Sequence, residues 1–458
     1  MKMMKGAVSI GLMAGIIGLS CFTPKLMASE VPAPSVPSGP SAGDGLRLED
    51  QARLPDLIVY AYEQNPAIQA AREASRAVVE KYRMSTSLPD PQLMVTYFPD
   101  PIETRLGPQD WNASISQRFP FPGRLSKEGE VAAQEVLMAR LDLDRTVRDV
   151  SVAIQESYHE LHYIRQARSI AGKNAGLLDE LRKISETAYA EDQATFLDVV
   201  KAQSQTGQLR YDMLLLEELE DTERTRLNGL LNRAPGAPIG ELAPVAVRPV
   251  VYTLDDIYAM AESRQEEIRT ADAQVSQAER RIELARYQNL PDFSVGLFYA
   301  GIGQPDVTMP PPDAGDDAVG IQFGVSIPLW FGKNAGRIRQ ATADAQRARA
   351  MKAERINQSR TQIRALYFRL RNAERLMTLY GKEMIPQALA SMETAETWFR
   401  EGQGSFSDFV EIQATVYNFQ LSLARARADY GKALAGLERL AGLDLTRQET
   451  ASAGEIKP

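Results

Sequence analysis

Glu186–Gln203 (ETAYAEDQATFLDVVKAQ) and Glu396–Gln413 (ETWFREGQGSFSDFVEIQ) lie 210 residues apart and share eight of their eighteen positions. The chain therefore carries an internal repeat. Gly402 can adopt the left-handed conformation that ends a helix. Ser405 in one copy and Thr195 in the other offer a hydroxyl to the first turn of a following helix. Each copy thus predicts a sharp turn between two helices.

Long helical segments lead into both turns, at residues 126–189 and 335–399. Their apolar residues recur every seven positions, which indicates coiled-coil-like packing against neighbouring helices. At 1.5 Å per residue, each segment would be a rod about 95 Å long. Shorter helices return after the turns, at residues 195–231 and 405–440.

Two strand hairpins precede the long helices, at residues 91–119 and 293–328. Apolar residues alternate there with small or polar ones, which suits strands with lipid or core on one face. Proline-rich loops are expected at residues 99–110 and 301–317. Because the smallest membrane barrels have about eight strands, four strands cannot close one, and three chains would be needed to supply about twelve.

The N-terminal segment has the features of an export signal. Lys2 and Lys5 precede an apolar run at residues 7–19 that is too short to span a bilayer. Further boundaries follow from Pro-rich and Gly-rich stretches and from the repeat itself. The expected organisation is a signal peptide (1–28), a disordered linker (29–47), a first repeat (48–232), a connector (233–252), a second repeat (253–442) and a tail (443–458).

Cys21 is the only cysteine, and it admits two interpretations. It lies where a lipoprotein signal places its acylated residue, so lipidation is the first. Gly18 and Leu19 match that signal poorly, whereas Ala28 followed by Ser29 suits ordinary cleavage, which would remove the cysteine and is favoured. Either way, the body of the chain has no cysteine for a disulfide or a thiolate metal site.

Composition argues against several classes of protein. The net charge is −8, and no basic block with interleaved aromatic residues is present, so nucleic acid is not an expected partner. His159 and His162 lie on one helical face but do not form the zinc-protease pattern, so a packing or surface role is expected. No phosphate loop, dinucleotide fingerprint or nucleophile elbow occurs. We expect no enzyme activity, no cofactor and no metal site.

The order of these elements, carried twice, resembles that of the TolC-like outer-membrane efflux proteins. Each copy runs from a helix through Leu-Pro-Asp, a strand hairpin and a long helix to the turn and the return helix. The resemblance covers nearly the whole mature chain. Four stretches strengthen it: SQRFPFPGR (116–124), SIPLWFGK (326–333), LLNRAPGAPIG (230–240) and LERLAGLDL (437–445).

The resemblance implies a mainly α fold with a small β part. Duplicated helical hairpins of three chains would form a trimeric α-barrel, and four strands per chain would contribute to a shared 12-stranded transmembrane β-barrel in outer-membrane lipid. Most of the chain would then lie in the bacterial periplasm. It also implies a homotrimer whose turns dock with a periplasmic adaptor (membrane fusion) protein, which links the duct to an inner-membrane RND-type pump.

The turns match the family's docking pattern of an aromatic residue, a glycine, a hydroxyl residue and an aspartate. The adaptor-docking candidates are Tyr189, Asp192, Thr195, Asp198, Phe399, Gly402 and Ser405. Asp192 stands where the family has its glycine, so the first turn departs from the pattern there.

By family position, Asp408 and Glu411 resemble residues of a periplasmic gate, and three chains would make them two rings of carboxylates. Gly404 stands where the family's gate has a basic residue, so a salt-bridged latch of that type is not expected. Lys201 occupies the position of Glu411 in the first copy, which therefore lacks the double acidic pattern. The alternative is that Asp408 only favours the helix start and Glu411 is solvated.

The expected function is that of a passive duct, the outer-membrane channel component of a tripartite efflux system. The alternative is a periplasmic coiled-coil scaffold whose strands form a soluble cap. The hairpin exit FPFPGR (119–124) and the connector resemble the heavy-metal branch of the family, and an acidic chain favours cations. Metal cations are therefore the expected cargo, with drugs or other small molecules as the alternative.

Overall fold

The computed structural model describes residues 48, 50–190, 195–401, 403 and 406–447. The predicted signal peptide and linker and most of the predicted tail lie outside these residues. The same holds for four of the predicted site residues, which are Cys21, Asp192, Gly402 and Ser405. Within the described residues helices dominate and strands are few, so the prediction of a mainly α fold with a small β part is confirmed.

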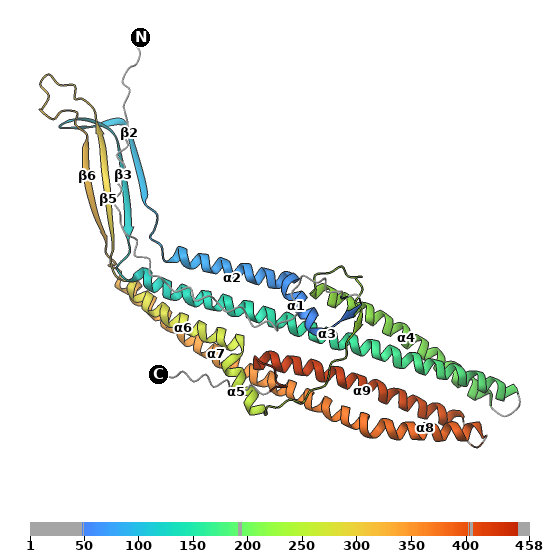
Figure 1. Ribbon diagram of the computed structural model, residues 1–458. Helices are drawn as coiled ribbons and strands as arrows, with labels where there is room; N and C mark the ends of the chain where they lie inside the picture. The colour runs from blue at the N-terminus through green and yellow to red at the C-terminus, as the bar shows by residue number, and fades with distance from the viewer. Residues whose placement is uncertain (1–47, 49, 191–194, 402, 404–405, 448–458) are drawn as a thin grey trace, which may run out of the picture. The chain divides into compact units, whose positions relative to one another are not determined.

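The two halves of the chain repeat one order of elements (Figure 1). The first half contains α1 (Leu54–Gln64), α2 (Pro66–Ser85), β2 (Gln92–Thr104), β3 (Gly107–Phe119), α3 (Arg124–Ala190) and α4 (Phe196–Leu230). The second contains α5 (Leu254–Arg264), α6 (Glu266–Tyr287), β5 (Asp292–Ile302), β6 (Ala318–Ser326), α7 (Phe331–Thr378), the π-helical turn η1 (Leu379–Met384), α8 (Ile385–Arg400) and α9 (Phe406–Ala441).

The four long strands form one antiparallel sheet in the order β2-β3-β5-β6. Each pair of neighbouring strands has a defined register, as in the pairing of Leu93 with Ile115 and of Leu297 with Ile321. β2 and β6 are the two edges of this sheet within the described residues. Along β6 the apolar side chains are widely exposed, and Phe323 keeps 80% of its surface. The sheet therefore presents an apolar face that none of the described residues covers.

The first hairpin corrects the prediction of a proline-rich loop at residues 99–110. β2 continues through Pro99 and Pro101 to Thr104, and β3 begins at Gly107. The register shifts between Tyr97 and Ile102, so a bulge accommodates the prolines. An edge strand tolerates proline because the missing N–H would have faced no partner strand.

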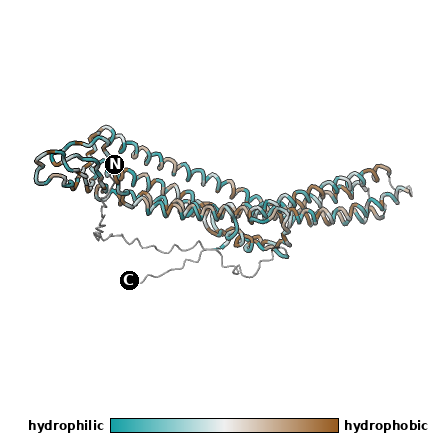
Figure 2. The backbone as a smooth tube through the Cα atoms, turned by 90° about the horizontal axis from the view of Figure 1, so that it is seen from above, coloured by the Kyte–Doolittle hydropathy of each residue, from teal (hydrophilic) through white to brown (hydrophobic). Residues whose placement is uncertain are grey.

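The helices pack side by side in a fixed order that follows the repeat. α3 lies between α4 and α9, and α9 in turn packs against α7 and α8. Nearer the strands the order is α2, α3, α6 and α7. Polar and apolar residues interleave along these helices, as Figure 2 shows, because each helix buries only part of its surface. At both levels a first-repeat helix stands at one edge and a second-repeat helix at the other.

Each repeat has its own apolar core, and the two cores consist of residues at equivalent positions. In the first, Ile154 and Leu161 of α3 pack with Leu227 of α4. In the second, Ile363 and Leu370 of α7 pack with their counterparts, among them Leu437 of α9. The long helices thus correspond at an offset of 209 residues, whereas the return helices correspond at 210.

The extra residue of the second repeat is absorbed by η1. The predicted helical segment over residues 335–399 is helical throughout, but it is not one regular α-helix, because it consists of α7, η1 and α8 in succession. Pro386 is the second residue after η1, and proline cannot donate the backbone hydrogen bond of a regular helix. One π-helical turn is the usual way in which a helix takes up a single inserted residue.

The connector between the repeats is held by contacts that the sequence did not predict. β1 (Gln51–Ala52) pairs in parallel with β4 (Glu241–Leu242). The Tyr158 hydroxyl of α3 donates hydrogen bonds to the carbonyl oxygens of Ala52 and Ala243. Within the described ranges, no helix combines the length and the apolar character needed to cross a bilayer.

Candidate functional site

The gate candidates Asp408 and Glu411 lie in the first turns of α9 and are exposed. Neither carboxylate forms an ion pair with another described residue. Phe409 and Val410, which lie between them, are buried. The start of α9 is thus anchored on its apolar face, while the two carboxylates point away from it. A carboxylate at this end of a helix is stabilised by the positive end of the helix dipole.

The apolar anchor joins the two helical hairpins of one chain. Phe409 and Val410 pack with Ala171 and Leu178 of α3 and with Leu209 of α4. The start of α9 is thereby packed on the first hairpin. Since the buried area is apolar on both sides, hydrophobic burial holds the two hairpins together here.

A hydrogen bond between α9 and α3 adds to this apolar contact, and together they form the junction between the two hairpins. The Gln413 amide nitrogen donates to Asn174 Oδ1 at 2.8 Å. Gln413 is almost completely buried, and its Oε1 oxygen has no hydrogen-bond partner among the described residues. An unpaired buried oxygen costs about 1–3 kcal/mol. The junction is therefore specific in its register but not fully stabilised.

Lys201 supplies a cation at this junction that sequence reasoning missed. Its Nζ donates a hydrogen bond to Ser407 Oγ at 2.8 Å, so the start of α4 is tied to the start of α9. The sequence signal was the exchange of sign between Lys201 and Glu411 at one repeat position. No sequence pattern could show that this lysine reaches the residue before Asp408, because the two lie on different hairpins.

The docking candidates that the structure describes lie near both turns. Tyr189 packs against Phe196 with ring centroids 5.9 Å apart, which holds the two sides of the first turn together. Both rings are widely exposed. Thr195 precedes α4, and Phe399 is half-buried against the apolar anchor. Asp198 lies in α4, and its side chain is not described. The docking and gate roles of all these residues stay predictions.

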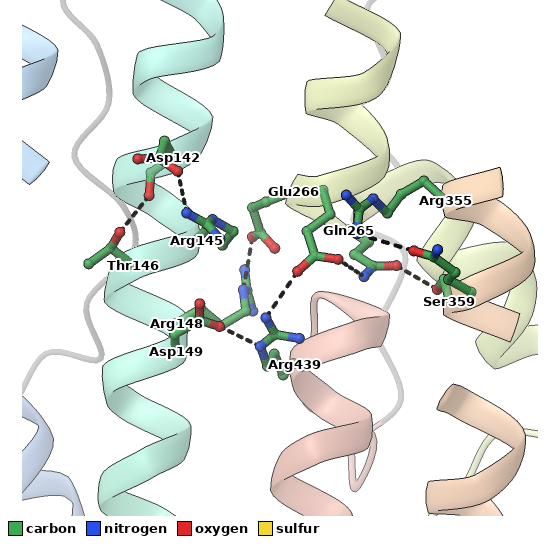
Figure 3. Close-up of polar contacts among 12 residues, drawn as sticks. Asp142, Arg145, Thr146, Arg148, Asp149, Gln265, Glu266, Arg355, Ser359 and Arg439 are labelled. Carbon is green, nitrogen blue, oxygen red and sulfur yellow. Dashed lines mark hydrogen bonds and ion pairs between the residues drawn. The ribbon is translucent and has the colours of Figure 1, made fainter. Parts of the chain in front are cut away.

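A second polar cluster joins α3, α6 and α9 (Figure 3). Arg148 of α3 donates to the buried Glu266 of α6 at 2.8 Å. Arg439 of α9 binds Asp149 of α3 and Glu267 of α6. Burial disfavours the charge of Arg439, yet its bonds to the two carboxylates raise its pKa. The cluster ties both repeats together by charge-assisted hydrogen bonds.

The histidines pack within the helical layer. The ring of His159 stands against Gly431 of α9, where a Cβ would collide with it. Burial, with a smaller effect of His162 and Lys432, lowers the pKa of His159 to about 4. Burial also lowers the pKa of His162. Among the described residues, no group of three or more histidine, cysteine or acidic side chains could hold a metal ion.

Comparisons with known proteins agree with this architecture. Residues 257–443 match the model of a family described as outer membrane efflux protein. A curated relative, the pyoverdine export outer membrane protein OpmQ of Pseudomonas aeruginosa, is 23% identical over 319 residues. That alignment covers 64% of this chain and 63% of OpmQ, so the chain spans less than two thirds of this relative's length.

Solved structures share the fold over most of the chain. The outer membrane protein VceC of Vibrio cholerae has a TM-score of 0.71 at 16% identity, covering 86% of this chain and 96% of VceC. CusC has a TM-score of 0.72 at 14% identity, covering 85% and 92%. The MtrE outer membrane channel of Neisseria gonorrhoeae has a TM-score of 0.69 at 16% identity, covering 86% and 91%. By the family match over residues 257–443 and by the fold that it shares with VceC, CusC and MtrE, the chain is similar to outer membrane efflux proteins.

Proposed function

We propose that the chain is the outer-membrane channel component of a tripartite efflux system, acting as a passive trimeric duct without a catalytic step. As an outer membrane efflux protein it belongs in the outer membrane, with most of its residues in the periplasm. The observation that carries the proposal is that the sheet and the helical layer each have two open edges among the described residues. In both, one edge comes from the first repeat and the other from the second.

The sheet is open at both edges. β2 of the first repeat and β6 of the second are the strands with one unpaired side among the described residues. Unpaired strand edges beside an exposed apolar face are a liability that closure into a barrel removes. Pairing of β6 in one copy with β2 in the next would close a ring of strands. Four strands per chain and three chains give about twelve, within the known range of membrane barrels.

The helical layer also has two edges that lack a packing partner among the described residues. α4 stands at one edge of the helical layer, and α7 and α8 stand at the other. Both edges carry exposed large apolar side chains, including Leu214 on α4 and Phe368 on α7. A head-to-tail contact between unlike edges generates a closed ring when the rotation matches. The strands and the helices therefore support one and the same ring.

The turns support docking to a periplasmic adaptor that connects the duct with an RND-type pump. Tyr189, Phe196 and Leu197 expose apolar surface around the first turn. Exposed apolar patches of this kind mark protein interaction sites. Asp408 and Glu411 would form carboxylate rings at the entrance of a trimer, and Lys201 would hold that entrance in one arrangement.

Metal cations are the cargo that we propose first. The chain is acidic, and Asp408 and Glu411 are free of ion pairs among the described residues. Carboxylate rings raise the local concentration of cations. The second candidate is a small organic molecule, because the relative OpmQ is named for pyoverdine export. A wide duct discriminates little, so the pump would select the cargo.

The proposal is tested by the native mass of the protein extracted from outer membranes in detergent. A heat-sensitive trimer with mixed helix and strand circular dichroism is expected. A monomer that is soluble without detergent would instead support the periplasmic scaffold. For the cargo, a deletion strain should become sensitive to metal cations. Sensitivity to organic compounds alone would favour the second candidate.

A further inference from the structure

A groove of about 430 Å³ lies where α9 passes between α3 and α7. Its buried lining residues are all alanines, namely Ala373 of α7 and Ala426 and Ala433 of α9. Leu366 and Leu376 of α7 add partly buried apolar surface. Sites for small molecules have volumes of about 300–1,000 Å³ and are mostly apolar, so the groove has the size and the lining for a small organic molecule.

The first repeat has larger side chains at the equivalent positions. At the offset of 210 residues, Ala426 corresponds to Leu216 and Ala433 corresponds to Glu223. Glu223 is buried and accepts a hydrogen bond from the Ser157 hydroxyl of α3. The packing of a return helix against its long helix therefore does not require alanine at these two positions. The small side chains, and with them the groove, are a feature of the second repeat.

The carboxylates that line the groove are already paired. A carboxylate oxygen of Asp429 lies 3.2 Å from Nε of Arg425, one turn earlier on α9. A carboxylate oxygen of Glu156 of α3 lies 3.7 Å from a guanidinium nitrogen of Arg226 of α4. A cation that entered the groove would have to displace an arginine from its carboxylate. The acidic residues therefore do not favour a cation here.

Three cations line the groove, and their charge is only partly compensated. Arg425 and Lys432 of α9 share the carboxylate of Glu160. An arginine has five N–H donors and a lysine has three, so both side chains keep donors for a ligand. Arg369 of α7 is exposed and forms no ion pair with another described residue. The charge that is available to a ligand in the groove is therefore positive.

The groove opens on the face of the helical layer opposite to α5. Ile363 and Leu370 of α7 pack with Ile257 of α5. Asn372, which lines the groove, is two residues from Leu370 and therefore points to the other side of α7. In the proposed ring of copies, α1, α5 and the connector between the repeats need the space outside the ring. The groove would then face the duct.

We propose that this groove binds a small organic anion with an apolar body, such as an aromatic carboxylate. The anionic group pairs with Arg369 and accepts a hydrogen bond from Lys432, and the apolar body lies against the alanines and leucines of the lining. The charge-assisted pair orients the ligand, and the apolar lining buries it. The site belongs to a single chain, and only its place on the wall of the duct rests on the proposed function.

The site discriminates between the two candidate cargoes. A binding site on a conduction path must release its ligand as well as capture it. The exposure of Arg369 meets this condition, because water can replace the anion at its guanidinium group. An organic anion is thus retained briefly as it passes, whereas a metal cation meets positive charge that is not compensated.

Calorimetric titration of the full-length protein in detergent with 2-naphthoate tests the site, and protein-free detergent gives the blank. The wild type should bind 2-naphthoate with saturation at one molecule per chain. Arg369→Gln should weaken this binding about tenfold, because it removes the lining cation that has no ion pair. The uncharged 2-naphthamide, with the same rings, should bind the wild type about tenfold more weakly than 2-naphthoate.

The matched control is Arg364→Gln, which removes another exposed arginine of α7 that does not line the groove. Its affinity for 2-naphthoate should stay within about twofold of the wild type, because an exposed charge outside the site contributes little. An equal loss in both variants would show a general attraction to arginines and overturn the site. Equal affinities of the wild type and Arg369→Gln would overturn it as well.

Filling the groove provides the second readout. Ala426→Leu introduces the side chain that the first repeat has at Leu216 and should abolish binding of 2-naphthoate. Circular dichroism checks that the variant is folded. Asn372→Trp blocks the groove from an exposed position and serves if the buried leucine prevents folding. Binding of 2-naphthoate at wild-type affinity in a folded variant of either kind would place the ligand elsewhere and overturn the proposal.

Conductance in planar bilayers separates the site from the proposed duct. Saturating 2-naphthoate should lower the conductance of wild-type channels and leave that of Arg369→Gln channels nearly unchanged. Calorimetric binding without any channel would overturn the duct and leave the site standing. Channels without calorimetric binding would overturn the site and leave the duct standing. Binding that leaves the conductance unchanged would overturn the place of the groove on the duct wall.

Discussion

The return helices α4 and α9 occupy the same place in the two repeats, yet α9 buries two faces and α4 only one. Both bury the face toward their own long helix, through Leu227 and Leu437. Only α9 also buries a second face, against α3 of the other repeat. The difference indicates that the return helix of this repeat can pack against a neighbouring helix on each of two faces. Among the described residues of one chain, only α9 packs on both faces, whereas one face of α4 has no packing partner.

The comparison predicts that apolar truncation is most costly where the two repeats meet. Phe409→Ala should reduce the free energy of unfolding by about 3–5 kcal/mol, because the ring is buried between the hairpins. The repeat counterpart Val199 is also buried but is a smaller side chain, so Val199→Ala should cost about half as much. Denaturant titration in detergent measures both. Equal losses would show that the two return helices are anchored alike.

The ends of the return helices differ in their response to pH. Burial, aided by Asp444 and opposed by the Leu445 N–H, raises the pKa of Glu438 to about 7. Its counterpart Asn228 cannot titrate and donates to the carbonyl oxygens of Pro235 and Ala237. Because the pKa in the folded state is above that in the unfolded state, the stabilisation by Glu438 is complete near pH 4. It is lost as the pH rises through 7.

This dependence should disappear in Glu438→Gln. The wild type should lose about 3 kcal/mol of unfolding free energy between pH 4.5 and 8 from this group, and the variant should lose much less. Thermal unfolding at a series of pH values measures the difference. An identical slope for both proteins would show that Glu438 is ionised in the folded state throughout.

Substitution of a glycine by alanine should affect stability in opposite directions in α9 and α4, because only the glycine in α9 is closely packed. Gly431→Ala should destabilise by about 1–3 kcal/mol, because its new methyl group would collide with the His159 ring. Gly207→Ala on α4 meets no neighbouring atom and should stabilise its helix by up to about 1 kcal/mol. His159→Ala combined with Gly431→Ala should recover part of the loss. Opposite signs for the two single variants are the essential result.

The smallest effect on stability is expected at the link between the turns. Lys201→Ala removes an exposed hydrogen bond to Ser407 and should change the unfolding free energy by less than about 0.5 kcal/mol. Under the gate hypothesis it should nonetheless raise ion conductance in planar bilayers. Lys183→Ala, which removes an exposed pair with Asp179, is the control. Unchanged conductance would exclude Lys201 from the gate.

The sequence predicted the repeat, the strand hairpins and the long helices because these depend on local periodicity. Apolar residues alternate along β6 and recur every seven residues around Ile363, and both patterns can be read from the sequence without knowing which elements pack together. The one-residue insertion at η1 was missed, although Pro386 is a local signal, because a proline inside a helical pattern does not say how the helix adapts. The length of β2 was missed because Pro99 is harmless only on an edge strand.

The sequence by itself determined the family resemblance, the element order and the positions of Asp408 and Glu411 at a helix start. Only the tertiary structure showed that Lys201 reaches Ser407, that Gly431 accommodates His159 and that α4 keeps one face open. The first two are contacts between hairpins that are far apart in the chain, and the third is the lack of such a contact among the described residues. Local pattern fixes which residues share a face of one helix, but which helix meets that face depends on the packing of the whole layer.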